Sequence, residues 1–203
     1  MPKVGMEPVR RRQLIDATLE SIGEVGYSAT TVQGIARRAG VSGGIIAHYF
    51  GSKLGLLEAT MLDLLRQLKN DLLARLPEHP TPQDRIAAII ATNFSKTQTD
   101  SLSAKTWLAF WSSAMHEPAF CRLQQINKSR LHSNLRVSFK TLGHPDPNLA
   151  ASSLAALIDG LWLRGALTQE GIDAQQCIAI CRNNVNLMLA SIPAKPNILM
   201  EPA

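Results

Sequence analysis

Apolar residues recur along this chain at the three- and four-residue spacing of amphipathic α-helices, and no segment alternates with the two-residue period of a strand. Over the first fifty residues, the spacing predicts three helices that end near Gly26, Ala39 and Tyr49. Thr30 or Thr31 can cap the second of them, because a hydroxyl oxygen accepts a hydrogen bond from a free backbone N–H of the first turn.

Six longer helices are predicted beyond Gly51, separated by prolines and glycines. Their expected bounds are Lys53–Leu76, Thr81–Thr97, Leu102–Met115, Pro118–Leu142, Asn148–Leu167 and Ala174–Ala190. The tail has three prolines from Pro193 onward, and we expect it to fray. The pattern therefore predicts an all-α chain of about nine helices.

The segment 31–50, TVQGIARRAGVSGGIIAHYF, has the spacing of a helix-turn-helix. Ala36 is small enough for two crossing helices to touch there, and Gly40 can adopt the positive φ that the turn needs. Three apolar residues follow at the offsets that lock the second helix onto the first: Val41, Ile46 and Tyr49. An ordinary helical hairpin is the alternative, but the segment is too short and glycine-rich for bundle helices.

We therefore expect residues 1–54 to form a helix-turn-helix DNA-binding domain and residues 55–203 to form a helical bundle that binds a ligand and dimerises. The helix Leu149–Leu167 is apolar almost all round, so a single bundle need not cover it. Paired with its symmetry mate, it would form a four-helix interface together with the last helix. A charge at Leu154 or Leu157 is then expected to disturb dimerisation or folding.

Several stretches resemble a known family. GYSATTVQGIARRAGVSGGIIAHYFGSKLGLLEAT resembles the signature of the TetR-type transcriptional repressors, over residues 12–59. Within that family, FWSSAMHEP, RLQQINKSRLHSNL and LAALIDGLWLRGAL resemble the choline-responsive repressors of glycine-betaine synthesis. The resemblance implies a homodimeric repressor that binds a pseudo-palindromic DNA operator and responds to choline or a related quaternary ammonium compound.

Two alternatives stay open. The first is a TetR-type regulator of another pathway, such as efflux, that senses a different small molecule. The second is an all-α ligand-binding or enzymatic bundle whose N-terminal helices are only structural.

The third helix is expected to enter the DNA major groove. It carries no Arg, Asn or Gln for bidentate reading of a base, so close backbone approach at Gly43 and Gly44 and methyl contacts from Ile45 or Ala47 would have to serve. The resemblance assigns phosphate contacts to residues around it. The full set of candidate DNA contacts is Thr31, Ser42, Gly43, Gly44, Ile45, Ala47, His48, Tyr49 and Lys53.

Two of these candidates, and the basic run near the N-terminus, have other interpretations. His48 could be an ordinary surface histidine, and Tyr49 could be wholly a core residue. The basic run Arg10–Arg12 could reach a minor groove as an arm or could be a disordered, solvated start.

The candidate ligand-binding residues are Trp107, Phe110, Trp111, Asp159 and Trp162. The first three are spaced i, i+3, i+4 on one helix, a pattern more often found in a core than in a pocket. However, the resemblance implies a choline-like ligand, and aromatic faces bind quaternary ammonium well. Asp159 could contribute a carboxylate to such a site, or it could form an internal ion pair with Arg164.

Composition adds a few limits. The net charge of +5 permits a nucleic-acid partner without demanding one. No apolar run approaches the roughly 18 residues that span a bilayer, and the basic N-terminus lacks a signal segment, so we expect a cytoplasmic protein that does not contact membranes.

Cofactor and enzyme chemistry are not expected. Cys177 and Cys181 stand four residues apart, which is more typical of a buried helix face than of a metal site. The five histidines show no metal spacing, and the chain has no G-x-S-x-G, P-loop, G-x-G-x-x-G or H-E-x-x-H motif. We therefore predict no metal, no cofactor and no catalytic residue.

Overall fold

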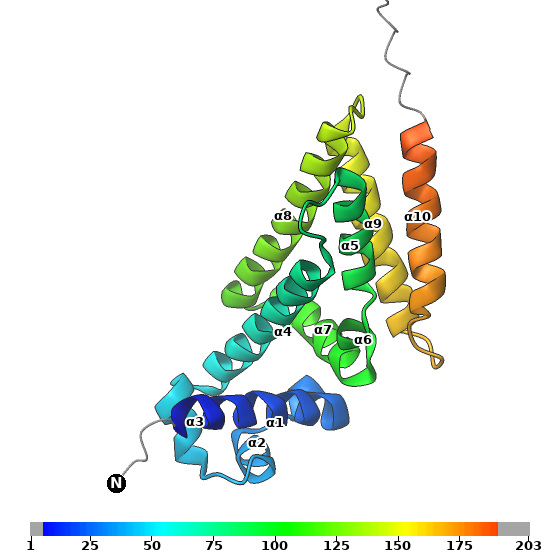
Figure 1. The fold of residues 1–203 in the computed structure, drawn as a ribbon. Helices are drawn as coiled ribbons and strands as arrows, with labels where there is room; N and C mark the ends of the chain where they lie inside the picture. Colours follow the sequence, from blue (N-terminus) through cyan, green and yellow to red (C-terminus); the bar gives the residue numbers. More distant parts are fainter. Residues whose placement is uncertain (1–5, 191–203) are drawn as a thin grey trace, which may run out of the picture.

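The computed structural model describes residues 6–190, and every regular element in that range is a helix (Figure 1). The elements are α1 (Met6–Ala29), α2 (Val32–Arg38), α3 (Gly43–Phe50), α4 (Lys53–Arg75), α5 (Pro82–Asn93), α6 (Lys96–Thr99), α7 (Ser101–Ala114), α8 (Pro118–Thr141), α9 (Pro147–Ala166) and α10 (Ala174–Ala190). The predicted all-α fold is confirmed. Of the ten helical segments in the described range, nine match the nine expected helices, and the tenth, α6, is a single turn. The tail from Pro193 lies outside the described residues.

One predicted helix is wrong at its C-terminal end. The pattern predicts a continuous helix from Thr81 to Thr97, but α5 ends at Asn93. Phe94 leaves the helical conformation at φ −109° and ψ 20°, and its side chain is buried in the core. Burial of this ring turns the chain, and the single turn of α6 follows in a new direction.

The first three helices form a small domain at the lower end of the molecule in Figure 1. Its core contains Leu14, Ile35 and Ile46, all almost fully buried. Leu56, from the first turns of α4, completes the same cluster. This domain is therefore closed by a helix that continues into the rest of the protein.

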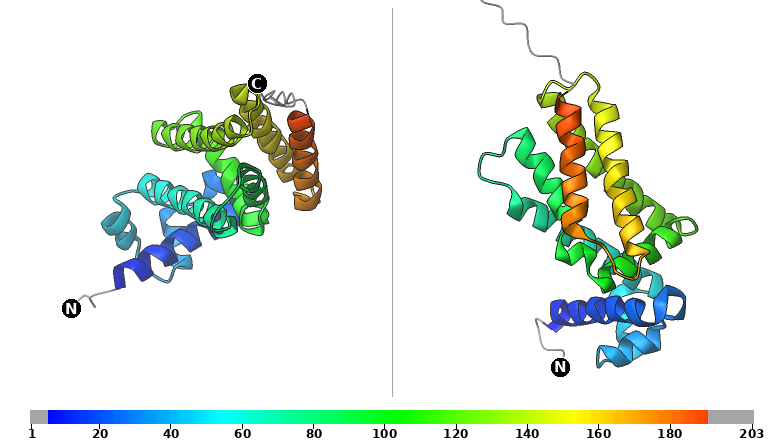
Figure 2. Two further views of the ribbon diagram at one scale, coloured as in Figure 1. Left: turned by 45° about the horizontal axis from the view of Figure 1, so that its top comes forward. Right: turned by 90° about the vertical axis from the view of Figure 1, so that its right-hand side faces the viewer.

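The remaining helices form the larger bundle, in which α8 and α9 pack side by side and α5 and α7 lie against them. The right-hand view of Figure 2, turned by 90° from Figure 1, shows α10 beside α9 on an outer surface. Cys177 and Cys181 of α10 are buried in the bundle core, as predicted. Burial and the neighbouring Cys177 raise the pKa of the Cys181 thiol to about 12. Within the described range, no helix has the length and apolar character needed to cross a membrane.

Two polar contacts join α1 of the small domain to helices of the bundle. The Arg12 guanidinium of α1 lies 2.8 Å from the carboxylate of Asp63 on α4, and Asp63 is buried. Towards the other end of α1, the Lys105 ammonium of α7 donates to the Gly23 carbonyl oxygen at 2.8 Å. These contacts tie the first helix to two different helices of the bundle.

Candidate functional site

The helix-turn-helix has the geometry that its sequence predicts. Gly40 adopts φ 65°, and the Val41 N–H donates to the Ala36 carbonyl oxygen at 2.9 Å, which closes the turn. Ala36 and Ile46 are buried where the two helices meet. The small residue, the turn glycine and the apolar contact thus fix the angle at which α3 stands on α2.

The outward face of α3 is exposed at Gly44, Ala47 and His48. These positions lie three and four residues apart, so they share one face of the helix. A Cβ at Gly44 would meet nothing within 4 Å, and Ile45 is only partly exposed beside them. At Gly44 the helix therefore exposes its backbone, with no side chain to keep a partner at a distance.

The two serine and threonine candidates stand at helix starts. The Thr31 hydroxyl oxygen accepts from the Gly34 N–H at 3.0 Å, so Thr31 is the cap of α2. The other candidate cap, Thr30, is buried and donates to the Gly26 carbonyl oxygen instead. Ser42 is the N-cap residue of α3, but its hydroxyl makes no capping bond, so it is available to a partner.

Tyr49 and Lys53 flank the exposed face of α3. Tyr49 is partly buried, with its ring 4.9 Å from that of His48 and the Arg11 guanidinium 5.6 Å from its centroid. The Lys53 ammonium lies 5.7 Å from the centroid of the Tyr27 ring. Both side chains are therefore held by aromatic neighbours on the side of the domain that carries α3.

The structure corrects both interpretations of the basic run at the N-terminus. Arg10 to Arg12 lie in the first turns of α1 and are neither a disordered start nor an extended arm. The Arg11 guanidinium pairs with Glu7 at 2.8 Å, and that of Arg12 pairs with Asp16 and Asp63. Carboxylates at helical spacing hold these cations against the helix, which explains why they do not extend from it.

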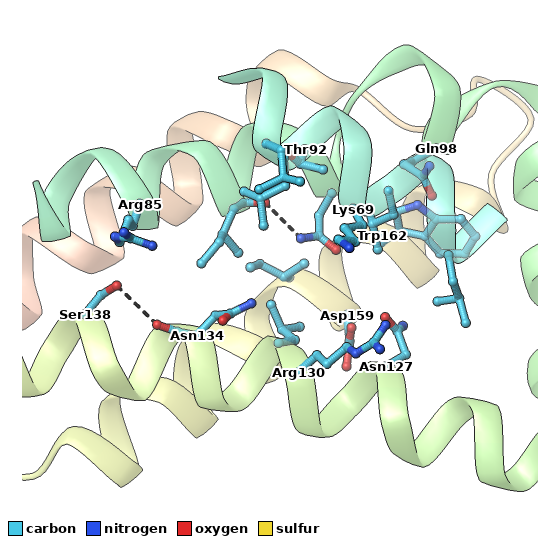
Figure 3. A pocket seen from close by; sticks show the side chains of 18 of the residues that line it. Lys69, Arg85, Thr92, Gln98, Asn127, Arg130, Asn134, Ser138, Asp159 and Trp162 are labelled. Atoms are coloured by element: carbon cyan, nitrogen blue, oxygen red, sulfur yellow. Dashed lines mark hydrogen bonds between the residues drawn. The ribbon is translucent and has the colours of Figure 1, made fainter. Parts of the chain in front are cut away.

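The bundle encloses a cavity of about 480 Å³ between α4, α5, α7, α8 and α9 (Figure 3). Four of the five predicted ligand-binding residues line it: Trp107, Trp111, Asp159 and Trp162. Phe110 does not. It packs edge-on against Phe120 at a centroid distance of 5.6 Å, because its position on α7 faces α1 and the start of α8 instead of the cavity.

The three indoles form one cluster at this cavity. Trp111 meets Trp162 edge-to-face at 5.0 Å between centroids, and Trp107 lies 6.5 Å from Trp111. Trp107 also donates through Nε1 to Gln98 Oε1 at 3.1 Å. Aromatic rings from α7 and α9 are thus brought together, which the spacing within either helix alone cannot establish.

Asp159 lies beside this cluster, three residues before Trp162 on α9. Asp159 is exposed in the single chain, but the surrounding protein removes enough water from its carboxyl group to raise its pKa above the usual range, and the charge of Lys128 opposes that shift. No ion pair joins Asp159 to Arg164 within residues 6–190. The two residues are five apart, so they point to different sides of the helix.

Buried polar atoms in the cavity wall lack partners. Thr92 Oγ1, Gln98 Nε2 and Trp111 Nε1 are inaccessible to solvent and make no hydrogen bond. Unpaired buried groups of this kind are costly and are common at sites that complete their bonding with a ligand or water.

Sequence reasoning missed most of the polar lining, which comes from four helices: Lys69, Arg85, Thr92, Gln98, Asn127, Arg130 and Asn134. Asn127, Arg130 and Asn134 are spaced three and four residues apart on one face of α8, within the stretch RLQQINKSRLHSNL, but the lining residues of the other helices share no motif with them. Only the packing of the helices brings them together.

Two family models match the chain. "Bacterial regulatory proteins, tetR family" covers residues 14–60, and "BetI-type transcriptional repressor, C-terminal" covers residues 82–190. The HTH-type transcriptional regulator BetI 2 of Chromohalobacter salexigens is 52% identical over 192 residues, which are 93% of this chain and 93% of that protein. The HTH-type transcriptional regulator BetI of Burkholderia lata is 51% identical over 193 residues, 94% of this chain and 100% of that protein.

Solved structures share the fold. A transcriptional regulator of Pseudomonas aeruginosa PAO1 superposes with a TM-score of 0.74 at 29% identity, over 91% of this chain and 92% of that one. A transcriptional regulator of Saccharomonospora viridis, solved in complex with choline, superposes with a TM-score of 0.77 at 18% identity, over 88% and 96% of the two chains. The second likeness is one of fold alone.

The placement of Lys53 generates a test of the DNA contacts. Replacing it by alanine should weaken DNA binding almost equally for all sequences and should lower the slope of log K against log salt by about one, because one phosphate contact is lost. Ile45→Ala should instead relax preference at one or two base pairs. Fluorescence anisotropy on specific and random duplexes over a range of salt measures both effects.

Lys140→Ala is the matched control, since Lys140 is an exposed lysine at the far end of α8. It should change neither quantity. A Lys53→Ala variant that kept the salt slope and altered sequence preference would show that the contacts are assigned to the wrong side chains.

Proposed function

The chain belongs to the TetR family of transcriptional regulators, and we propose that it is a cytoplasmic, homodimeric repressor of choline-to-glycine-betaine genes that responds to choline. The family accounts for a regulator that binds an operator and a small-molecule effector and is not an enzyme. The observation that carries the proposed effector is the cavity in which three indoles and a carboxylate meet.

The cavity suits the head group of choline on electrostatic grounds. A trimethylammonium group cannot donate a conventional hydrogen bond, so aromatic faces and a nearby carboxylate are the groups best able to bind it. Each well-placed, desolvated ring contributes about 2 kcal/mol, and the ionised form of Asp159 adds an opposite charge. The names of the relatives and the choline-bound Saccharomonospora regulator of the same fold support the same ligand.

The route from this cavity to the DNA runs through α4. Its C-terminal half lines the cavity with Leu65, Lys69 and Leu72, and its N-terminus carries Lys53 and the core residue Leu56. We propose that choline favours one orientation of α4 and thereby one spacing of the two DNA-reading domains in the dimer. Half-sites about 34–36 Å apart, or further, demand a particular spacing, so a change in it alters operator affinity.

Dimerisation is proposed through the outer faces of α9 and α10, which lie side by side (Figure 2). Leu149 and Leu163 of α9, Leu167 directly after it and Leu187 of α10 are exposed in the single chain, whereas Leu154 is fully buried in the chain's own core. Because Leu154 faces the bundle core and not the outer surface, a charge there should disturb folding, which is one of the two effects expected from the apolar pattern. The exposed leucines are the better candidates.

Leu187→Glu tests this surface. The charge should convert the dimer to a monomer that keeps its helical circular-dichroism spectrum, because Leu187 is 64% exposed in the single chain and its replacement does not disturb the core. Sedimentation velocity measures the mass. Val25→Glu, at an exposed apolar position of α1, should remain dimeric, and a dimeric Leu187→Glu variant would place the interface elsewhere.

Calorimetry tests the effector. Choline should bind with micromolar to millimolar affinity, and its uncharged isostere 3,3-dimethylbutan-1-ol should bind at least about tenfold more weakly, because it lacks the charge that the rings and Asp159 attract. Asp159→Asn should weaken choline about tenfold and leave the alcohol nearly unchanged.

Phe110→Leu is the matched control for the aromatic residues of the cavity, since Phe110 points away from the cavity. Trp111→Leu should weaken choline binding more than Phe110→Leu does. A protein that binds its operator but gives no heat with choline would refute the choline proposal and leave the repressor standing.

A further inference from the structure

Asp63 is a buried carboxylate on α4 that takes no part in the proposed DNA or ligand contacts. Its side chain is 9% exposed, and it accepts from Gln67 Nε2 at 2.7 Å and from Arg66 Nη1 at 3.2 Å. Both donors stand on α4 itself, so they hold the carboxylate in one orientation. A charge in such a place is costly to bury unless it is paired and hydrogen-bonded.

Arg12 of α1 supplies the pairing from outside α4. Its Nη1 donates to Asp63 at 2.8 Å and is the only donor to that carboxylate from another helix within residues 6–190. The same guanidinium pairs with Asp16 at 2.6 Å, one turn further along α1. Both partners of the bond between Arg12 and Asp63 are therefore fixed to their own helices, and the bond joins the DNA-binding domain to α4.

The ion pair lies on the face of α4 that is turned away from the cavity. Each residue of a helix is rotated by about 100° from the one before it. Leu65 and Leu72, which line the cavity, therefore lie about 180° to 200° around α4 from Asp63. Leu56, which closes the core of the N-terminal domain, lies seven residues before Asp63 and on nearly the same side. The helix is held between the cavity on one face and the DNA-binding domain on the other.

The helix α1 is attached at two places to two helices that both line the cavity. Arg12 joins it to α4, and Gly23 joins it through Lys105 to α7. The two attachments are eleven residues apart, which is about 16 Å along α1. When α4 moves relative to α7, the attachment at Arg12 turns α1 about the attachment at Gly23. Because α2 and α3 share a hydrophobic core with α1, they turn with it.

We infer that Asp63 is a positioning residue for DNA binding: through Arg12 it fixes the orientation of the recognition helix and transmits to it the movement that the ligand causes. The first part concerns the repressor alone. The second part rests on the proposed route from the cavity through α4. Neither residue lines the cavity, so neither contributes to ligand binding itself.

The first test needs no ligand and uses fluorescence anisotropy with the full-length protein. Specific binding requires both domains of the dimer at the spacing of the half-sites, whereas non-specific binding depends on phosphate contacts alone. Asp63→Asn should weaken binding to the operator, identified by footprinting, about fivefold and should not weaken binding to a random duplex. Loss of a negative charge by itself would strengthen binding to all DNA, so the expected loss has the opposite sign to a net-charge effect.

Arg12→Gln should weaken operator binding by the same factor, and the double variant should lose no more than either single one, because both residues act through one contact. Arg12→Gln leaves Asp63 its bonds to Arg66 and Gln67, so this variant should fold even if Asp63→Asn does not. Arg12→Lys, which keeps the charge, should retain more operator affinity than Arg12→Gln does.

Arg75→Gln is the matched control. Arg75 pairs with Asp71 at 3.1 Å, and both partners stand on α4. Neither residue lines the cavity, so the substitution removes an ion pair of the same helix that does not reach α1. This variant should keep the operator affinity of the wild type within about twofold.

The second test measures how choline changes operator binding. In the wild type, saturating choline should change the Kd of operator about fivefold or more. In Arg12→Gln and Asp63→Asn, that change should fall to about twofold or less. Calorimetry without DNA should give the same Kd of choline for the variants and the wild type within about twofold, since the cavity is unaltered.

The outcomes separate the two parts of the inference from the proposed effector. Variants that bind operator as tightly as the wild type would overturn the positioning role. Equal losses on operator and random DNA in Arg12→Gln alone, with a lower salt slope, would also overturn it and make Arg12 a phosphate contact. Variants that lose operator affinity but keep the full choline effect would support the positioning role and overturn the transmission. A wild type that does not bind choline would refute the effector, while the operator test would still decide the role of Asp63.

Discussion

The helix α4 has to satisfy two hydrophobic cores at once, and the rest of the molecule depends on this constraint. Leu56 closes the core of the N-terminal domain, and one residue later Leu57 enters the core of the bundle. Gly55 makes the junction possible, because a Cβ there would collide with the Phe50 carbonyl oxygen at the end of α3. The orientation of the recognition helix is therefore fixed relative to the same helix that lines the cavity.

Because of this arrangement, a movement of α4 at the cavity also moves the end of α4 that joins the DNA-binding domain. From Lys53 to Leu72, α4 spans about 29 Å, and a small rotation near the cavity is carried along its length. The contacts of α1 limit the possible movements, since Asp63 of α4 pairs with Arg12 near one end of α1 and Lys105 of α7 bonds to Gly23 near the other. Because α7 also carries Trp107 and Trp111, two of the helices that line the cavity contact the N-terminal domain.

Much of this could be predicted from local sequence. The turn at Gly40 and the burial of Ala36 and Ile46 follow from spacing, because residues close in the chain determine a helix-turn-helix. The same reasoning failed where long-range packing decided the outcome. Phe94 turns into the core and ends α5 early, and Phe110 faces away from the cavity although its helical spacing to Trp107 suggests a shared stripe.

The cavity illustrates the limit most clearly. The cluster of Trp111 and Trp162 requires two helices far apart in the sequence to face each other. The cations Lys69, Arg85 and Arg130 stand on three different helices and share no pattern, so no reading of single helices could group them. The sequence indicates the residue types, and only the packing of the helices places them around one cavity.

We propose that ligand and DNA act on the same conformational equilibrium through α4. Thermodynamic linkage then requires choline and operator to change each other's affinity by one factor. The direct measurement is the Kd of choline with and without saturating operator, identified by footprinting upstream of the chain's own gene, beside the Kd of operator with and without saturating choline. The account predicts equal ratios of about fivefold or more, and a choline Kd that is the same with and without operator would contradict it.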